Sequence, residues 1–253
     1  MPLLAAALAW GVILGTPQRE IHALPDADDV HDVPAQSYFV GGDLNKEYVV
    51  IGKTSSRPKK LCVVMPGGPG GIEFLPFVKR ILKFGLEYGW MVVEPIAVKW
   101  SDDPSYVVWP SATTPYAPAK FTTETFLDGI LDELPSRLKM QIDGTYLLGW
   151  SSSGPAIYSY AGHGKHEIKG AFVAMSVFDP KSFGGQNKLR VGRFYLLHSP
   201  QDFIPMSHPE AAKAALSNLG IPVKLDTYQG GHGWHGSVFD EIRDGMTFLA
   251  TKA

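Results

Sequence analysis

A cluster of small residues that suits nucleophilic chemistry lies near the middle of the chain, in the sequence GWSSSG at residues 149–154. It follows an apolar run that predicts a strand and precedes a run that predicts a helix. A sharp strand-to-helix turn strains its central residue and requires small residues two positions away on each side. With Ser151 at the centre, those positions hold Gly149 and Ser153. With Ser152 at the centre, one of them holds the bulky Trp150. The pattern predicts that Ser151 attacks a carbonyl carbon, and helix capping is the alternative use of such serines.

A serine hydroxyl becomes nucleophilic at neutral pH when a neighbouring base accepts its proton. His232 is the preferred base, because glycines flank it and it follows the preceding predicted strand sooner than His235 does. A carboxylate that holds the imidazole in the required tautomer completes such a site. Asp202 follows the predicted strand at residues 193–198 and is the preferred acid, with Asp179 as the alternative.

The sequence PGGPGG at residues 66–71 follows another apolar run and supplies main-chain hydrogen-bond donors. Attack on a carbonyl places negative charge on its oxygen, which needs N–H groups aimed at it. We expect one donor to be the N–H of Ser152 and the other to come from Gly67 or Gly68, since glycine brings the main chain close without a Cβ. A phosphate-binding loop is the competing interpretation. The run lacks the Lys-Ser/Thr ending of a Walker A loop and the spacing of a dinucleotide fingerprint.

These segments can cooperate only if one sheet brings them to the same edge. Short β-rich runs alternate with helical stretches from residue 38 onward, which predicts an α/β fold, a mostly parallel sheet of about eight strands with helices on both faces. Two strands joined by a turn, at residues 38–40 and 47–52, predict an antiparallel leading edge. Sites in such sheets form at the carboxyl ends of the strands, here the loops after Met65, Trp150, His198 and Tyr228.

The remaining elements are expected between these loops. Strands are predicted at residues 61–65, 90–95, 144–150, 170–178, 193–198 and 223–228. Helices are predicted at residues 73–88, 121–140, 152–161, 208–219 and 238–250.

Length and composition bound the class of protein. The 253 residues suit one large domain, and 45% apolar with 19% charged residues is a globular composition. Lys and Arg total 23 against 25 Asp and Glu, a net charge of −2 that gives no strong attraction for nucleic acid or an anionic membrane. The one cysteine, Cys62, excludes an intrachain disulfide and a Cys-rich metal site. The sequence implies no metal and no organic cofactor, and it carries no signal for an oligomeric state.

The N-terminal run at residues 3–15 is apolar and uncharged. It is too short to span a bilayer, which takes a helix of about 20 residues. Its length fits the apolar region of a secretory signal peptide, although only the α-amino group supplies positive charge. We expect residues 1–24 to be a signal peptide or apolar leader, residues 25–37 a polar lead-in and residues 38–253 the catalytic domain. Export to the periplasm or the exterior then follows, with no membrane anchor in the mature protein, whereas a retained leader implies the cytoplasm.

Four sequences resemble elements of the α/β-hydrolase superfamily and follow one another in the same order as in that superfamily: PGGPGG, GWSSSG, LLHSPQDFIP and GGHGW. The Ser, Asp, His order of the candidates is also the one expected there. The resemblance spans about residues 38–253 and implies an α/β-hydrolase fold without a large cap domain. It implies a serine esterase similar to carboxylesterases, dienelactone hydrolases and polyhydroxybutyrate depolymerases. PGGPGG resembles the HGGPGG loop of proline iminopeptidases, a likeness that assigns the second oxyanion donor to Gly68; Pro66 replaces their His, and Ser153 replaces the usual glycine.

The expected substrate is an uncharged ester of small to medium size, because no cationic pocket is identifiable. Residues 96–120 follow the fourth strand and are rich in aromatic side chains and proline. Trp100 and Trp109 in this segment, with Trp150 and Trp234 beside the nucleophile and the base, are the expected substrate-binding residues, and packing is their alternative role. Two other functions stay open: an aminopeptidase or amidase, which needs carboxylates to hold a free amine, and a non-catalytic binding protein of the same fold.

Overall fold

The computed structural model describes residues 28–53, 59–183, 185 and 188–251. The expected leader at residues 1–24 and the first part of the expected lead-in lie outside the described residues. The rest of the lead-in holds a 3-10 turn, η1 (Asp28–Val30), and the start of the first strand. No helix within the described ranges is both long enough and apolar enough to cross a membrane.

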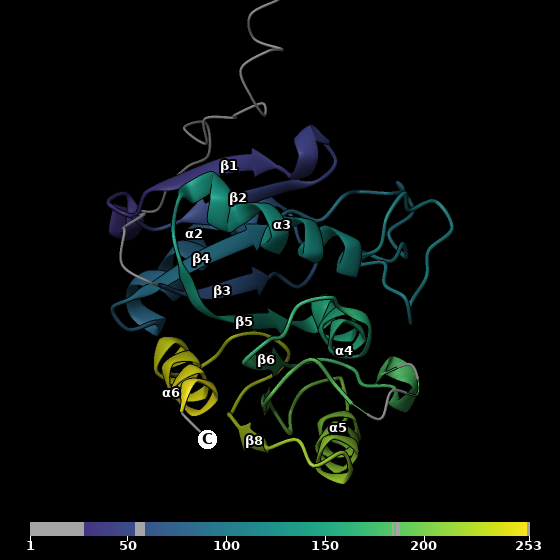
Figure 1. Cartoon of the computed structure of the whole chain (residues 1–253). Helices are drawn as coiled ribbons and strands as arrows, with labels where there is room; N and C mark the ends of the chain where they lie inside the picture. Colours follow the sequence, from purple (N-terminus) through teal and green to yellow (C-terminus); the bar gives the residue numbers. More distant parts are fainter. Residues whose placement is uncertain (1–27, 54–58, 184, 186–187, 252–253) are drawn as a thin grey trace, which may run out of the picture.

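The described residues form one sheet of eight strands in the spatial order β1-β2-β4-β3-β5-β6-β7-β8 (Figure 1). The strands are β1 (Ala35–Phe39), β2 (Glu47–Ile51), β3 (Lys59–Met65), β4 (Trp90–Pro95), β5 (Ile142–Trp150), β6 (Gly170–Ala174), β7 (Phe194–His198) and β8 (Val223–Thr227). β2 pairs antiparallel with β1 and β4, and all other neighbours are parallel. The expected mostly parallel sheet with an antiparallel leading edge is therefore confirmed.

The central strand β3 is buried on both of its faces. Leu61, Val63 and Met65 belong to the hydrophobic core on one side of the sheet. Cys62 and Val64 belong to the core on the other side, as the alternation of side chains along a strand requires. A continuous apolar run is the sequence pattern of a strand covered by helices on both faces.

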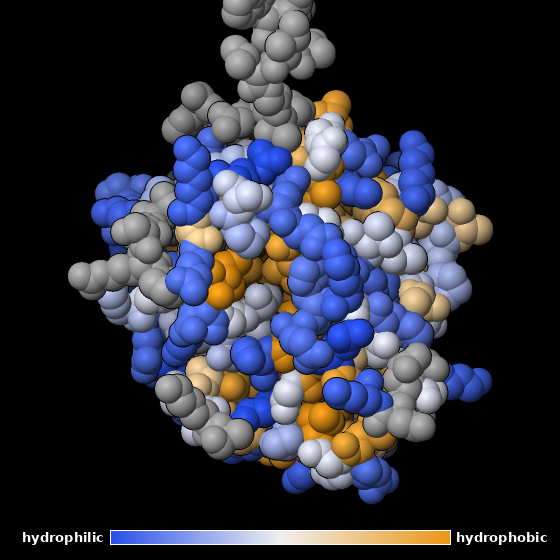
Figure 2. Space-filling view, viewed as in Figure 1, coloured by the Kyte–Doolittle hydropathy of each residue, from blue (hydrophilic) through white to orange (hydrophobic). Residues whose placement is uncertain are grey.

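Helices form a layer on each face of the sheet. One layer contains α3 (Thr123–Leu138), α4 (Gly154–His163) and α5 (Ser207–Asn218). The other contains α2 (Leu75–Arg80) and α6 (Val238–Ala250). Hydrophilic side chains cover most of the face shown in Figure 2, with smaller hydrophobic groups between them, so the apolar stripes of the helices are largely turned inward.

The helix expected at residues 73–88 is shorter and less regular than predicted. It begins with a 3-10 turn, η3 (Ile72–Phe74), continues as α2 and ends in a π-helical turn, η4 (Ile81–Gly85). At Gly85 the main chain approaches α6 so closely that an added Cβ would lie 3.1 Å from Cγ2 of Ile242. The helix therefore ends where it contacts α6, a segment far away in the sequence. The periodicity of residues 73–88 carries no information about that contact.

The strand expected at residues 170–178 also ends early, at Ala174. Met175 has a φ of 41°, a left-handed conformation that turns the chain away from the sheet. The turn places the hydroxyl of Ser176 2.7 Å from the carbonyl oxygen of Ser151, to which it donates a hydrogen bond. The shorter strand thus brings a supporting side chain to the candidate nucleophile.

Residues 96–122 connect β4 with α3 and contain no helix or strand (Figure 1). The part of the chain that the structure describes contains no separate cap domain, in agreement with the expectation.

Candidate active site

Ser151 occupies a strained turn between β5 and α4. It opens the 3-10 turn η5 (Ser151–Ser153), and its φ of 54° lies in the left-handed region, which side chains disfavour. Such strain persists where surrounding contacts fix it, and it is frequent at functional sites. The hydrogen bond from Ser176 to the main chain of Ser151 is one of these contacts.

The small residues around the turn have a steric reason. A Cβ at Gly149 would lie 2.5 Å from the hydroxyl oxygen of Ser153 and 3.0 Å from the carbonyl oxygen of Met65. The Ser153 hydroxyl is buried, lies 2.7 Å from that same carbonyl oxygen, and accepts a hydrogen bond from the N–H of Trp150 at 2.9 Å. Ser153 therefore replaces the usual glycine with a side chain that ties the turn to the end of β3.

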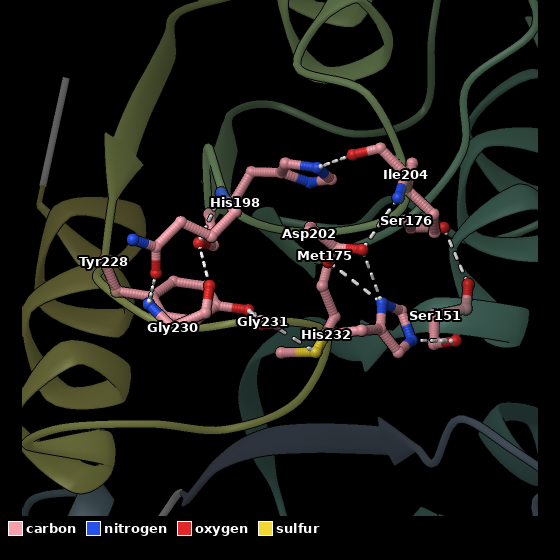
Figure 3. A network of polar contacts seen from close by, with 12 residues as sticks. Ser151, Met175, Ser176, His198, Asp202, Ile204, Tyr228, Gly230, Gly231 and His232 are labelled. Carbon is pink, nitrogen blue, oxygen red and sulfur yellow. Dashed lines mark hydrogen bonds and ion pairs between the residues drawn. The ribbon is translucent and has the colours of Figure 1, made fainter.

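Three side chains from separate loops form a continuous chain of hydrogen bonds (Figure 3). Nε2 of His232 lies 2.9 Å from the hydroxyl oxygen of Ser151. Nδ1 of His232 lies 3.0 and 2.9 Å from the two carboxylate oxygens of Asp202. The Asp202 side chain is 0% exposed and that of His232 22% exposed, so the acid is shielded while the base reaches the surface.

The alternative base and acid have other contacts. The ring of His235 stacks on Tyr228, with 6.2 Å between the ring centroids. The carboxylate of Asp179 accepts a hydrogen bond from the N–H of Lys181 at 2.8 Å, as a turn aspartate does. Asp202 and His232 therefore belong to the series of hydrogen bonds that ends on Ser151, whereas Asp179 and His235 do not.

The acid is held by its own loop. One carboxylate oxygen of Asp202 accepts the N–H of Ile204 at 2.8 Å. The carbonyl oxygen of Ile204 lies 2.8 Å from Nε2 of the buried His198, at the end of β7. The turn from Asp202 to Ile204 therefore fixes the orientation of the carboxylate, and His198 attaches this turn to the end of β7.

Three side chains hold the loop of the base, a role that the sequence pattern did not reveal. The hydroxyl of Ser199 donates to the carbonyl oxygen of Gly230, and the side-chain oxygen of Gln201 accepts the Gly230 N–H at 3.0 Å. The hydroxyl of Tyr228 donates to the carbonyl oxygen of Gly231 at 3.2 Å. Burial raises the pKa of Tyr228 to about 12, so this hydroxyl remains a donor at neutral pH.

The PGGPGG loop lies against the nucleophile turn. Gly68 has a φ of 56°, and its carbonyl oxygen accepts a hydrogen bond from the hydroxyl of Ser152 at 2.9 Å. A Cβ at Gly67 would lie 2.6 Å from the indole of Trp150, so glycine is required for this approach. Nε1 of Trp109 donates to the carbonyl oxygen of Pro66 at 3.1 Å and fixes the start of the loop.

The four tryptophans occupy two kinds of environment. Trp109 is 4% exposed and Trp150 6% exposed, so both mainly pack the loop and the turn rather than form an open surface. Trp100 is partly exposed and packs edge-on against Phe121, with 5.1 Å between centroids. Trp234 is also partly exposed, and its ring packs edge-on against Trp150 at 5.6 Å.

Glu94 is a buried carboxyl group near the end of β4 that the sequence pattern did not reveal. Neither of its carboxyl oxygens has a hydrogen-bond partner among the described residues. Burial, with a smaller contribution from the negative charge of Glu73, raises the pKa of Glu94 well above its usual range. In the described part of the chain, no three His, Cys, Asp or Glu side chains gather in a way that could hold a metal ion.

No protein-family model and no curated relative matches the chain. Solved structures do match it. The carboxylesterase of Bacillus cereus is 14% identical, with a TM-score of 0.57 over 80% of this chain and 93% of that one. Esterase PE8 is 20% identical, with a TM-score of 0.57 over 79% and 97%. The S-formylglutathione hydrolase FrmB of Staphylococcus aureus is 13% identical, with a TM-score of 0.58 over 94% and 98%. With the sheet order described above, these likenesses show that the chain has the α/β-hydrolase fold.

Proposed function

We propose that this protein is a serine hydrolase that cleaves carboxylic esters through an acyl-enzyme intermediate. The observation that carries the proposal is the hydrogen-bond chain from Ser151 through His232 to the buried carboxylate of Asp202. A nucleophile, a base and a group that orients the base, all within hydrogen-bond distance, are what covalent acyl transfer requires.

The first half of the reaction forms the acyl-enzyme. His232 accepts the hydroxyl proton of Ser151 as the serine oxygen attacks the ester carbonyl carbon. The negative charge on the carbonyl oxygen is stabilised by the N–H groups proposed as donors, those of Ser152 and Gly68. His232 then gives the proton to the leaving alcohol, while Asp202 stabilises the imidazolium.

The second half regenerates the enzyme. Water loses a proton to His232 and attacks the acyl-enzyme carbonyl, and the acid product leaves as the proton returns to Ser151. Trp100 and Trp234 are the proposed contacts for a small-molecule ester at the mouth of the site, because both are partly exposed. Export behind a cleaved leader at residues 1–24 is part of the proposal, and N-terminal sequencing of the mature protein tests it.

Hydrolysis of p-nitrophenyl acetate, butyrate and octanoate by the full-length protein and by Ser151→Ala tests the function. We expect turnover by the parent and a loss of at least about a hundredfold in the variant, the scale for a triad nucleophile. Circular dichroism spectra of both proteins control for folding. Equal activity of the two proteins would exclude Ser151 as the nucleophile. Inactivity toward these esters with cleavage of amino-acid anilides would favour an aminopeptidase, and inactivity toward both would favour a binding protein.

A further inference from the structure

Phe203 is an exposed aromatic side chain directly beside the proposed base. It is 77% exposed, yet its ring lies 4.4 Å from the imidazole of His232, centroid to centroid, with an angle of 41° between the planes. The structure describes four other large hydrophobic side chains as exposed: Leu44, Phe84, Tyr88 and Val177. Phe203 is distinguished from them by its ring contact with His232, the proposed base.

The main chain on either side of Phe203 is fixed. The preceding residue, Asp202, donates its N–H to the carbonyl oxygen of Ser199 at 3.1 Å. The following residue, Ile204, donates its N–H to the Asp202 carboxylate at 2.8 Å. The phenyl ring is thus carried by the same turn that directs the acid, and the turn holds its attachment point beside the imidazole. One part of the ring contacts His232, and the large exposed part is available to another molecule.

The reaction identifies which part of a substrate would reach that surface. This step rests on the proposed function. His232 must deliver a proton to the leaving oxygen, so the group attached to that oxygen passes beside the imidazole. The acyl group extends from the carbonyl carbon bound to Ser151. We infer that Phe203 binds the alcohol part of the ester and makes the protein selective for esters of aromatic alcohols, because a flat ring gains most from a phenyl surface.

Two esters that differ only in the alcohol separate a role in substrate binding from a purely structural role of Phe203. Methyl acetate and benzyl acetate form the same acetyl-enzyme and differ only in the alcohol, so a difference in kcat/KM reports contacts made by the alcohol. For full-length Phe203→Ala, followed by acid release, we expect kcat/KM for benzyl acetate to fall about five- to tenfold, the scale of one aromatic contact. The value for methyl acetate should change less than about twofold, and Phe203→Tyr, which keeps the ring, should retain the benzyl preference.

The controls distinguish the inference from the proposed function. Leu44→Ala removes an exposed apolar side chain that lies in the turn between β1 and β2, and it should leave both substrates unaffected. An equal loss for both esters in Phe203→Ala would mean that the ring only shields the acid and base, and would overturn the inference. No loss for either ester would also overturn it. If the parent cleaves the p-nitrophenyl esters but neither of these acetates, the inferred selectivity is overturned. If it leaves the p-nitrophenyl esters intact as well, or if Ser151→Ala is equally active, the proposed function itself fails.

Discussion

The side-chain oxygen of Gln201 accepts the main-chain N–H of Gly230 at 3.0 Å, and this bond joins the loop of the proposed acid to the loop of the proposed base. The hydroxyl of Ser199 donates to the carbonyl oxygen of the same glycine and accepts the N–H of Gln201 at 3.0 Å. Gly230 is two residues from His232, and Gln201 is adjacent to Asp202. The distance between the acid and the base is therefore set by contacts between two loops as well as by the sheet.

Removing the acceptor on Gln201 should disturb this distance. For Gln201→Leu we expect kcat to fall about tenfold with little change in KM, because a small displacement of the base affects proton transfer more than substrate binding. Gln201→Glu keeps an oxygen acceptor and should retain most of the activity. Steady-state kinetics on p-nitrophenyl butyrate measures both variants, and a loss in Gln201→Glu as large as that in Gln201→Leu would contradict the argument.

Ser153 should contribute to stability through its buried hydroxyl. In Ser153→Ala the carbonyl oxygen of Met65 and the N–H of Trp150 lose a hydrogen-bond partner inside the core. We expect the free energy of unfolding to fall by about 1–3 kcal/mol, the cost of leaving buried polar groups unsatisfied. Urea denaturation measures the change, with Ser217→Ala on the exposed side of α5 as the matched control. Equal stability of the two variants would show that the hydroxyl has no such role.

Cys62 should be unreactive until the protein unfolds. Its side chain is fully buried in β3, and burial raises the pKa of the thiol above its usual range, so the reactive thiolate is disfavoured. We expect 5,5′-dithiobis(2-nitrobenzoic acid) to label the chain at the rate of unfolding in buffer and at once in concentrated urea. Because the chain has one cysteine, each labelled molecule reports one event. Rapid labelling of the folded protein would place this strand nearer the solvent than the structure does.

The sequence predicted the features that local patterns encode. The continuous apolar run of β3 indicated a strand buried on both faces, and the candidates Ser151, Asp202 and His232 each follow a predicted strand. Parallel strands end at one edge of a sheet, so three local patterns were enough to predict one site. The hydrogen bonds that hold the two loops in place, such as the one between Gln201 and Gly230, were not part of that prediction.

The features that the sequence did not reveal depend on contacts between distant segments. Gly230, the hydrogen-bond partner of Gln201, lies in another loop. The exposed ring of Phe203 becomes a candidate substrate contact only because it lies beside His232. The helix at residues 73–88 was predicted too long because its last turn packs against α6. Nothing in the apolar strand around Glu94 distinguishes a buried carboxyl from an exposed one at a strand end.

Glu94 should make the stability of the protein depend on pH. Because burial raises its pKa in the folded state, the folded chain keeps a proton that the unfolded chain loses above about pH 4.3. The folded state is thus at its most stable with respect to this group below that pH, and it loses stability as the pH rises toward the folded pKa. Gln has nearly the same shape and no charge, so Glu94→Gln should gain stability over the parent progressively between pH 5 and 8.

Urea denaturation at several pH values tests this dependence directly. The difference in free energy of unfolding between Glu94→Gln and the parent should be smallest at pH 5 and should increase with pH, because only the parent must then bury a charge or retain a proton. Glu210→Gln, which changes an exposed carboxylate on α5, is the matched control and should give a difference that is nearly constant. A constant difference for Glu94→Gln as well would mean that the folded protein accommodates the charged carboxylate at β4 as readily as water does.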